Sequence, residues 1–249
     1  MFSTVRGAGR LASNALLACC YFVIIAVRPS RRSHYGQQFL YKTEGGTFER
    51  AFAAFEQTEA GARLLATAPD SVALLRERAA LQALPPGSLG YAYGDFMVRS
   101  EIDEDLYLAG AVEAGLRFER DPRRRWFRTR VEAGHDLRHV LTDYGIDPLG
   151  ETCLMAFRFG QTRHVGAFVI AALGCSVLAG RRQPGLIAAV REAYRRGRAA
   201  QLLDLLPWEE LMATPLAAVQ QAAGLETPRR YPPVGTPAER GRPVLEAAA

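Results

Sequence analysis

Apolar residues recur every three or four positions along most of the chain, which is the spacing of one face of an α-helix. The pattern predicts amphipathic helices over Thr47 to Glu59, Asp103 to Leu116 and Pro184 to Leu203, and one or two short helices over 208–224. No segment shows a convincing alternation of apolar and polar residues, and no internal repeat is present. We therefore expect an all-α protein, a single-domain bundle of many helices.

Capping residues predict where several helices begin. Asp70 is a favourable N-cap for the segment SVALLRERAALQAL, and a long helix is expected from Pro122 to Leu141. After a turn, Asp147 can cap the next helix, with Pro148 in its first turn. The segment 84–96 (LPPGSLGYAYGDF) lacks phosphate-loop spacing and predicts a double-proline turn that leads into a helix allowing close backbone approach.

Two segments are strongly apolar. Leu11 to Val27 lies at the lower limit for a membrane-spanning helix, and arginines on both sides give it no clear orientation. This pattern favours a helix buried in the core or lying at a membrane surface, while a span or a targeting segment remains an alternative. Val165 to Gly180 is short and interrupted by glycine, so we expect a central helix against which others pack closely.

The composition provides enough apolar residues for a full hydrophobic core. About half of the 249 residues are apolar, which suffices for one large domain. We expect an apolar helix in 1–32, a helical domain over 33–225 and a flexible proline-rich tail in 226–249. The net charge of +5 is mild, and Lys42 is the only lysine, a bias that indicates a GC-rich, bacterial genome. The four cysteines form no CxxC pair, which fits a reducing compartment.

An arginine-rich segment, ERDPRRRWFRTR, precedes the expected turn. A solvated helix face is the commonest interpretation of such a segment, followed by a membrane-surface patch with aromatic anchors. Nucleic-acid contact is the weakest interpretation, because the net charge of the chain is modest. The residues concerned are Arg120, Arg123, Arg124, Arg125, Arg128 and Arg130, interrupted by Trp126 and Phe127.

The segment GHDLRHVLTDYGIDPLGE holds the candidate chemistry. On a helix, His135 and His139 lie about 40° apart and Asp136 about 60° from His139, so the three share one face. Glu151 follows in the first turn of the next expected helix and can return to the same point. Two neutral imidazoles and two carboxylates balance the charge of a divalent cation, for which zinc, manganese and ferrous iron all qualify.

The histidine pair has two other interpretations. The polar residues could simply pair with neighbouring arginines such as Arg138, but the downstream Glu151 favours a metal site. A bare His-Asp pair also suggests a phosphohydrolase, which needs further His and Asp ligands on other helices. Only His34 and His164 remain, and neither lies in a comparable setting.

The spacing HDxxH, eleven residues, then Glu resembles the hallmark of a coenzyme Q (ubiquinone) biosynthesis family, named after the fourth member of the mitochondrial series. HVLTDYGIDPLGE, LQALPPGSLGYAYGDFM and LLPWEELMATPLAAVQ also resemble blocks of that family, so the resemblance covers roughly residues 45 to 225. The sequence departs from the family at TRVEAG, before the motif, and at Asp143 and Tyr144 in the loop. This is a divergent member by that comparison.

The resemblance implies an all-helical protein, peripheral on the quinone-making membrane, that binds one divalent metal (zinc first, iron or manganese next) and a polyprenyl lipid. In a bacterium this is the cytoplasmic face of the inner membrane, and in a mitochondrion the matrix side. It implies oxidative decarboxylation of a prenylated hydroxybenzoate, with the ring carboxylate replaced by hydroxyl. The alternative is a non-catalytic scaffold presenting lipid intermediates. Expected partners are other pathway proteins and a second copy of the chain, without nucleic acid.

Overall fold

The computed structural model describes residues 39–100, 109, 112, 113, 117 and 119–231. Thirteen helices lie wholly within these residues. The described residues form no strand, only an isolated antiparallel bridge between Ser88 and Pro215. The expected all-α class is confirmed for this part of the chain.

The described helices differ widely in length. In chain order they are α3 (Thr47–Glu56), α4 (Glu59–Thr67), α5 (Ser71–Arg76), α6 (Arg78–Gln82), α7 (Leu89–Ser100), α9 (Pro122–Ala133), α10 (His135–Thr142), α11 (Pro148–Thr162), α12 (Val165–Gly180), α13 (Leu186–Ala199), the 3₁₀ helix η2 (Leu203–Leu205), α14 (Trp208–Leu211) and α15 (Leu216–Ala222).

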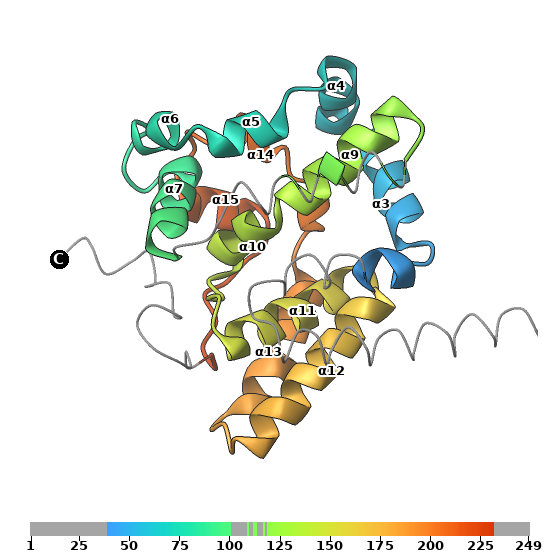
Figure 1. Cartoon of the computed structure of the whole chain (residues 1–249). Helices are drawn as coiled ribbons and strands as arrows, with labels where there is room; N and C mark the ends of the chain where they lie inside the picture. The colour runs from blue at the N-terminus through green and yellow to red at the C-terminus, as the bar shows by residue number, and fades with distance from the viewer. Residues whose placement is uncertain (1–38, 101–108, 110–111, 114–116, 118, 232–249) are drawn as a thin grey trace, which may run out of the picture.

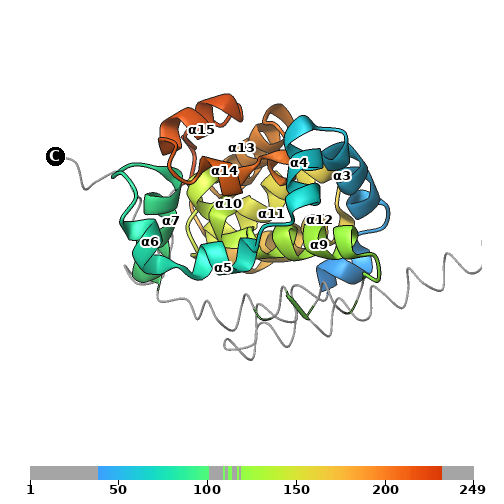
Figure 2. The same ribbon diagram turned by 90° about the horizontal axis from the view of Figure 1, so that it is seen from above.

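Helix α10 occupies the centre of the arrangement and contacts α7, α9, α11 and α15 (Figure 2). Below it, α11, α12 and α13 lie side by side (Figure 1). Glycines allow the backbones of α11 and α13 to meet: a Cβ on Gly197 would lie 2.1 Å from the Phe157 carbonyl oxygen. A Cβ on Gly160 would lie 2.4 Å from the Tyr194 carbonyl oxygen. The later turns of α11 therefore pack backbone to backbone against α13.

The main hydrophobic core surrounds α10 and α11. Its members include Leu89 and Tyr93 of α7, Leu137 of α10, and Leu149 and Leu154 at the start of α11, each at most 1% exposed. These positions recur at helical spacing, so each helix turns one apolar face towards the others. A smaller core lies between α3, α4 and α9.

Most of the expected helix starts are confirmed. The Asp70 carboxylate accepts a hydrogen bond from the Ala73 backbone N–H at 2.9 Å and begins α5, and Asp147 caps α11 in the same way. Two expected helices are divided. The helix after Asp70 is interrupted at Glu77, and the expected helix from Pro122 to Leu141 is interrupted at Gly134.

Gly134 explains the second division. Its backbone angles (φ −75°, ψ 8°) lie outside the helical region, and the Trp208 indole packs beside it, with Nε1 3.7 Å from where a Cβ would be. The motif histidines consequently lie on the separate short helix α10 rather than at the end of a long one. The expectation of one continuous helix was wrong at this point.

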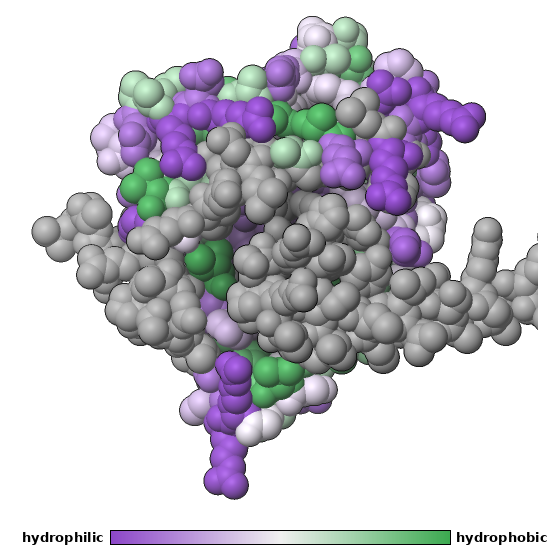
Figure 3. Space-filling model, viewed as in Figure 1, coloured by the Kyte–Doolittle hydropathy of each residue, from purple (hydrophilic) through white to green (hydrophobic). Residues whose placement is uncertain are grey.

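Helix α12 is less central than its composition indicates. Gly166, Ala167 and Ala171 are buried, but Val165 and Phe168 are 54% and 52% exposed. In Figure 3 some apolar residues reach the surface in the lower part of the view, where α12 and α13 lie, beside hydrophilic residues that project from the same part. Within the described residues, no helix combines the length and the apolarity needed to cross a membrane.

Several expectations lie outside the described residues. They are the apolar segment 11–27 and most of the helix expected over 103–116. Residues 226–231 were expected to begin a flexible tail, but Tyr231 packs its ring against Tyr144. The contacts of the helical domain therefore extend past residue 225.

Candidate metal centre

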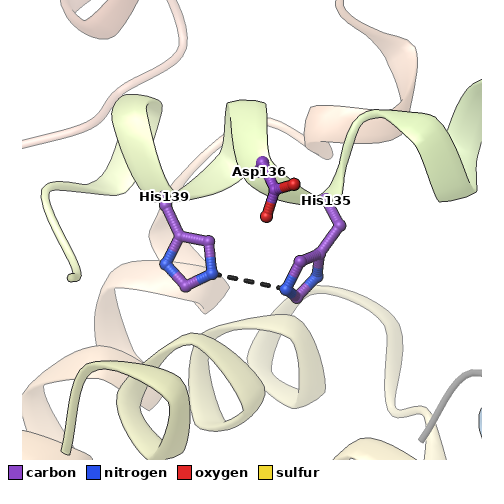
Figure 4. Close-up of side chains that lie close together, drawn as sticks. All are labelled: His135, Asp136 and His139. Carbon is purple, nitrogen blue, oxygen red and sulfur yellow. Dashed lines mark hydrogen bonds between the residues drawn. The ribbon is translucent and has the colours of Figure 1, made fainter. Parts of the chain in front are cut away.

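Helix α10 brings three of the four expected ligands together. His135, Asp136 and His139 each offer one ligand atom, and these atoms lie within 4.8 Å of one another. The Nε2 atoms of the two histidines are 3.3 Å apart, and in Figure 4 the Asp136 carboxylate projects from the helix above the line that joins them. Because residues i and i+4 share a helix face, the short helix itself places the two histidines next to each other.

Helix α11 supplies the fourth residue. Oδ1 of the fully buried Asp147 accepts hydrogen bonds from the backbone N–H groups of Leu149 and Gly150 at 3.0 and 3.1 Å. This cap sets the first turn of α11, which carries Glu151. The Glu151 carboxylate lies 3.4 Å from Nε2 of His139 and 4.0 Å from Nε2 of His135.

The separations among His135, His139 and Glu151 can be compared with those of a four-coordinate cation. Ligands bound tetrahedrally to zinc at about 2.0–2.1 Å stand about 3.3–3.4 Å from one another along each edge of the tetrahedron. The distance between the two histidine Nε2 atoms and that between His139 and Glu151 match this edge without any movement of the helices. The distance of 4.0 Å from His135 to Glu151 is longer than such an edge. The donor set therefore fits a divalent cation.

A hydrogen bond behind His139 orients its ring. Nδ1 of His139 donates to the Tyr144 carbonyl oxygen at 2.9 Å, since a carbonyl can only accept. The lone pair of the neutral ring is then on Nε2, the atom that faces Glu151. The ring also stacks on Phe96 of α7, with ring centroids 5.8 Å apart and an interplanar angle of 16°. Sequence reasoning missed both supports, because neither follows from motif spacing.

The charges of the cluster are coupled. Burial, followed by repulsion from His139, lowers the pKa of His135 to about 3, so this imidazole is neutral. Burial is the largest single influence on His139 and opposes its protonation, but the attraction and hydrogen bond of Glu151, the charge of Asp136 and the Tyr144 carbonyl together raise the pKa of His139. Desolvation raises the pKa of Glu151, yet the attraction of His139 leaves it below its usual value. The negative potential that favours a proton on His139 favours a cation at the same place.

His164, considered above as an additional ligand, has a different role. Its side chain caps α12, where Nδ1 accepts a hydrogen bond from the Ala167 backbone N–H at 3.3 Å. His164 is not part of the ligand group found in the described residues, and His34 lies outside them.

Two arginines of the arginine-rich segment lie inside the protein. Arg128 and Arg130 are only 4% and 1% exposed. Arg128 donates to Glu44 at 2.9 Å and to Glu119 at 2.6 Å, and Arg130 donates to Glu209 at 2.7 Å. For these two residues, a solvated helix face was the wrong interpretation, because carboxylates from distant segments pair with them inside the protein.

Known proteins share this fold. A crystal structure of a protein provisionally assigned to ubiquinone biosynthesis, from Nostoc punctiforme PCC 73102, matches with a TM-score of 0.57 and 19% identity. The match covers 87% of this chain and 99% of that one. At this identity the match shows a common fold.

Sequence relatives agree with the fold. The mitochondrial ubiquinone biosynthesis protein COQ4 of Pyricularia oryzae is 25% identical over 168 residues, 68% of this chain and 54% of that protein. The mitochondrial COQ4 homolog of Drosophila melanogaster is 29% identical over 99 residues, 40% of this chain and 35% of that protein. The matches thus span about half, or less, of these relatives. The family model for "Coenzyme Q (ubiquinone) biosynthesis protein Coq4" matches residues 11–229, and the chain belongs to that family.

Proposed function

We propose that His135, Asp136, His139 and Glu151 bind one divalent cation. The observation that carries this proposal is the convergence of both Nε2 atoms and the Glu151 carboxylate at distances close to a tetrahedral edge. Zinc is the preferred ion because it accepts two imidazoles and two carboxylates in this geometry, and iron and manganese are the alternatives.

We further propose a role in ubiquinone biosynthesis, in keeping with the family. The proposed reaction replaces the ring carboxylate of a prenylated hydroxybenzoate with a hydroxyl group, releasing carbon dioxide. This exchange removes two electrons from the substrate. With dioxygen as the proposed acceptor and water as the source of the hydroxyl oxygen, the balanced step consumes one dioxygen and one water and releases carbon dioxide and hydrogen peroxide. A bound cation would supply polarisation of the substrate's carboxylate or phenol oxygen. The chain itself contributes neutral His135 and ionised Glu151, which hold that charge in place.

A scaffolding role is the second candidate, and one observation favours it. Four protein ligands fill a tetrahedral site, and filled sites are typical of structural zinc, whereas catalytic zinc keeps an open position. In this alternative the protein holds a polyprenyl intermediate for partner enzymes. The outward apolar residues Val165, Phe168 and Ile187 would lie against lipid.

The proposed place of action is a membrane surface, where a prenylated precursor resides. The relatives named above are mitochondrial by name, and for a mitochondrial chain we propose the matrix side of the inner membrane. For a bacterial chain we propose the cytoplasmic face of the inner membrane. Other proteins of the pathway are the proposed partners.

Metal analysis of the purified full chain tests the site. We expect about one divalent ion per chain, and a largely metal-free protein for His139→Ala. The matched control is His164→Asn, which alters a buried histidine outside the site and keeps an acceptor for the α12 cap. Full metal occupancy in His139→Ala, or an equal loss in the control, would contradict the assigned ligands.

A reconstituted reaction distinguishes the enzyme from the scaffold. The purified protein, loaded with metal, is given a prenylated hydroxybenzoate labelled with ¹³C at the carboxylate, together with dioxygen. Release of labelled carbon dioxide with formation of the hydroxylated ring is expected, and its loss in His139→Ala is the control. Tight lipid binding without turnover would favour the scaffold instead.

A further inference from the structure

The described part of the C-terminal segment, residues 225–231, returns to the loop that joins α10 and α11 (Figure 1). At its end, the Tyr231 hydroxyl donates a hydrogen bond to Oδ2 of Asp147 and accepts one from the Gly145 backbone N–H at 3.0 Å. The Tyr231 ring meets Tyr144 edge to face, with ring centroids 5.4 Å apart. One side chain thus contacts the loop at three points, more than 80 residues away in sequence.

Two of the contacted residues support different ligands. The Tyr144 carbonyl accepts from Nδ1 of His139 and so directs Nε2 of that ring towards the centre. The other oxygen of Asp147, Oδ1, caps α11 and sets the turn that carries Glu151. A shift of this loop would therefore change the distance between His139 and Glu151, now 3.4 Å.

The chemistry of Tyr231 and Asp147 favours a lasting hydrogen bond between them. Asp147 is fully buried, so its carboxylate depends on the protein for hydrogen bonds. Burial and the neighbouring Asp147 carboxylate raise the pKa of Tyr231, which keeps the hydroxyl a donor at neutral pH. Hydrogen bonds to charged groups are among the stronger ones in proteins, and groups behind a metal's ligands commonly change metal affinity by about 10-fold to 100-fold.

We propose that Tyr231 is a positioning residue of the metal centre: by clamping the loop at Tyr144, Gly145 and Asp147, it holds His139 and Glu151 at metal-binding separation. This inference rests on the proposed metal-binding function. It gives the C-terminal segment a task that nothing in the motif itself indicates.

The test compares Tyr231→Phe with the wild-type chain and with Tyr194→Phe. Tyr194 lies on α13, where its hydroxyl accepts a hydrogen bond from Arg163 rather than from the motif loop. Each variant loses one hydroxyl and keeps its ring. Zinc affinity is measured by competition with a chromogenic chelator, well below the melting temperature of each protein, and cobalt(II) absorption reports the geometry of the site.

We expect Tyr231→Phe to bind zinc about 10-fold more weakly and to shift the cobalt(II) bands, while Tyr194→Phe matches the wild type. Wild-type affinity and an unchanged spectrum in Tyr231→Phe would overturn the clamp and leave metal binding intact. An equal loss in both variants would also overturn it. A wild-type chain that binds neither zinc nor cobalt(II) would instead overturn the proposed function on which the clamp depends.

A second variant covers the case in which Tyr231→Phe fails to fold. Asp147→Asn removes the charge that the hydroxyl binds but keeps Oδ1 as the cap of α11. The clamp predicts weaker zinc binding in this variant too, and a double variant with Tyr231→Phe whose loss of binding free energy is smaller than the sum of the two single losses. Wild-type affinity in Asp147→Asn would count against the clamp.

Discussion

Two buried histidines of this protein show how the surroundings of a residue decide its role. His139 is 1% exposed and His164 is 3% exposed. The ring of His139 faces two carboxylates, which raise its pKa against burial. The ring of His164 accepts a backbone hydrogen bond at the start of α12, and burial, with repulsion from Arg158, lowers its pKa to about 3. Burial alone therefore does not distinguish a ligand from a cap.

The low pKa of His164 predicts a pH-dependent stability. In the unfolded chain its pKa is about 6.5. Above that pH neither state is protonated at this residue, and no dependence arises. As the pH falls below it, only the unfolded state takes up the proton, so the free energy of unfolding decreases by about 1.4 kcal/mol per pH unit. His164→Asn keeps a cap acceptor and removes this contribution.

Urea unfolding of both proteins between about pH 7 and pH 5 measures this effect. The curve of the variant is expected to be flatter, and the difference between the two proteins should change by about 2 kcal/mol from pH 6.5 to pH 5. Other groups, His135 among them, contribute equally to both curves and cancel. Parallel curves would mean that His164 is protonated in the folded protein.

At the scale of elements, helix α11 joins the site to the scaffold. Its first turn carries Glu151, and its later turns pack backbone to backbone against α13 through Gly160 and Gly197. A change in the packing of α11 and α13 should therefore reach the site.

Gly197→Ala tests this packing. The added methyl group would lie 2.1 Å from the Phe157 carbonyl oxygen, an atom of the backbone that cannot turn aside. We expect the free energy of unfolding to decrease by about 3 kcal/mol, and zinc binding to weaken as α11 shifts. Gly180→Ala on α12 is the control, because a Cβ there meets nothing within 4 Å. Urea unfolding measures both, and equal stability of the two variants would contradict close packing of α11 on α13.

Local signals predicted the elements well, and tertiary contacts explain the failures. Asp70, Asp147 and Pro148 act on the next few backbone groups. The start of each of these helices can therefore be predicted from a few consecutive residues. The interruption at Gly134 depends in part on Trp208, which packs there from a later helix. The ligand set of the candidate site could be proposed from spacing, because one helix and one cap bring its members together. Its supports at Phe96 and Tyr231 could not, because they come from distant segments.

At the scale of the whole molecule, arginine pairs connect segments that are far apart in sequence. Arg130 of α9 donates to Glu209 of α14 and to the Asp204 carbonyl oxygen of η2, and Ser71 of α5 donates to the same Glu209. The guanidinium also lies 4.8 Å from the centre of the Phe55 ring. Composition could not predict this use of arginine, since the partners of each cation come from tens of residues away.

The neighbouring residues Glu209 and Glu210 allow the value of burial to be measured directly. Glu209 is 4% exposed and pairs with Arg130, whereas Glu210 is 39% exposed and pairs with Arg63, which is 48% exposed. Glu209→Gln leaves a buried guanidinium without its counter-charge and should lower the free energy of unfolding by about 3 kcal/mol. Glu210→Gln should change it little, because solvent already screens that pair. Both variants exchange a carboxylate for an amide of the same shape in the same short helix, so helix propensity cancels in urea unfolding. If both variants lost equal stability, helix α14 rather than the buried pair would be the cause. If neither lost stability, the contacts of Arg130 to backbone carbonyls would be enough to hold the buried guanidinium without the Glu209 charge.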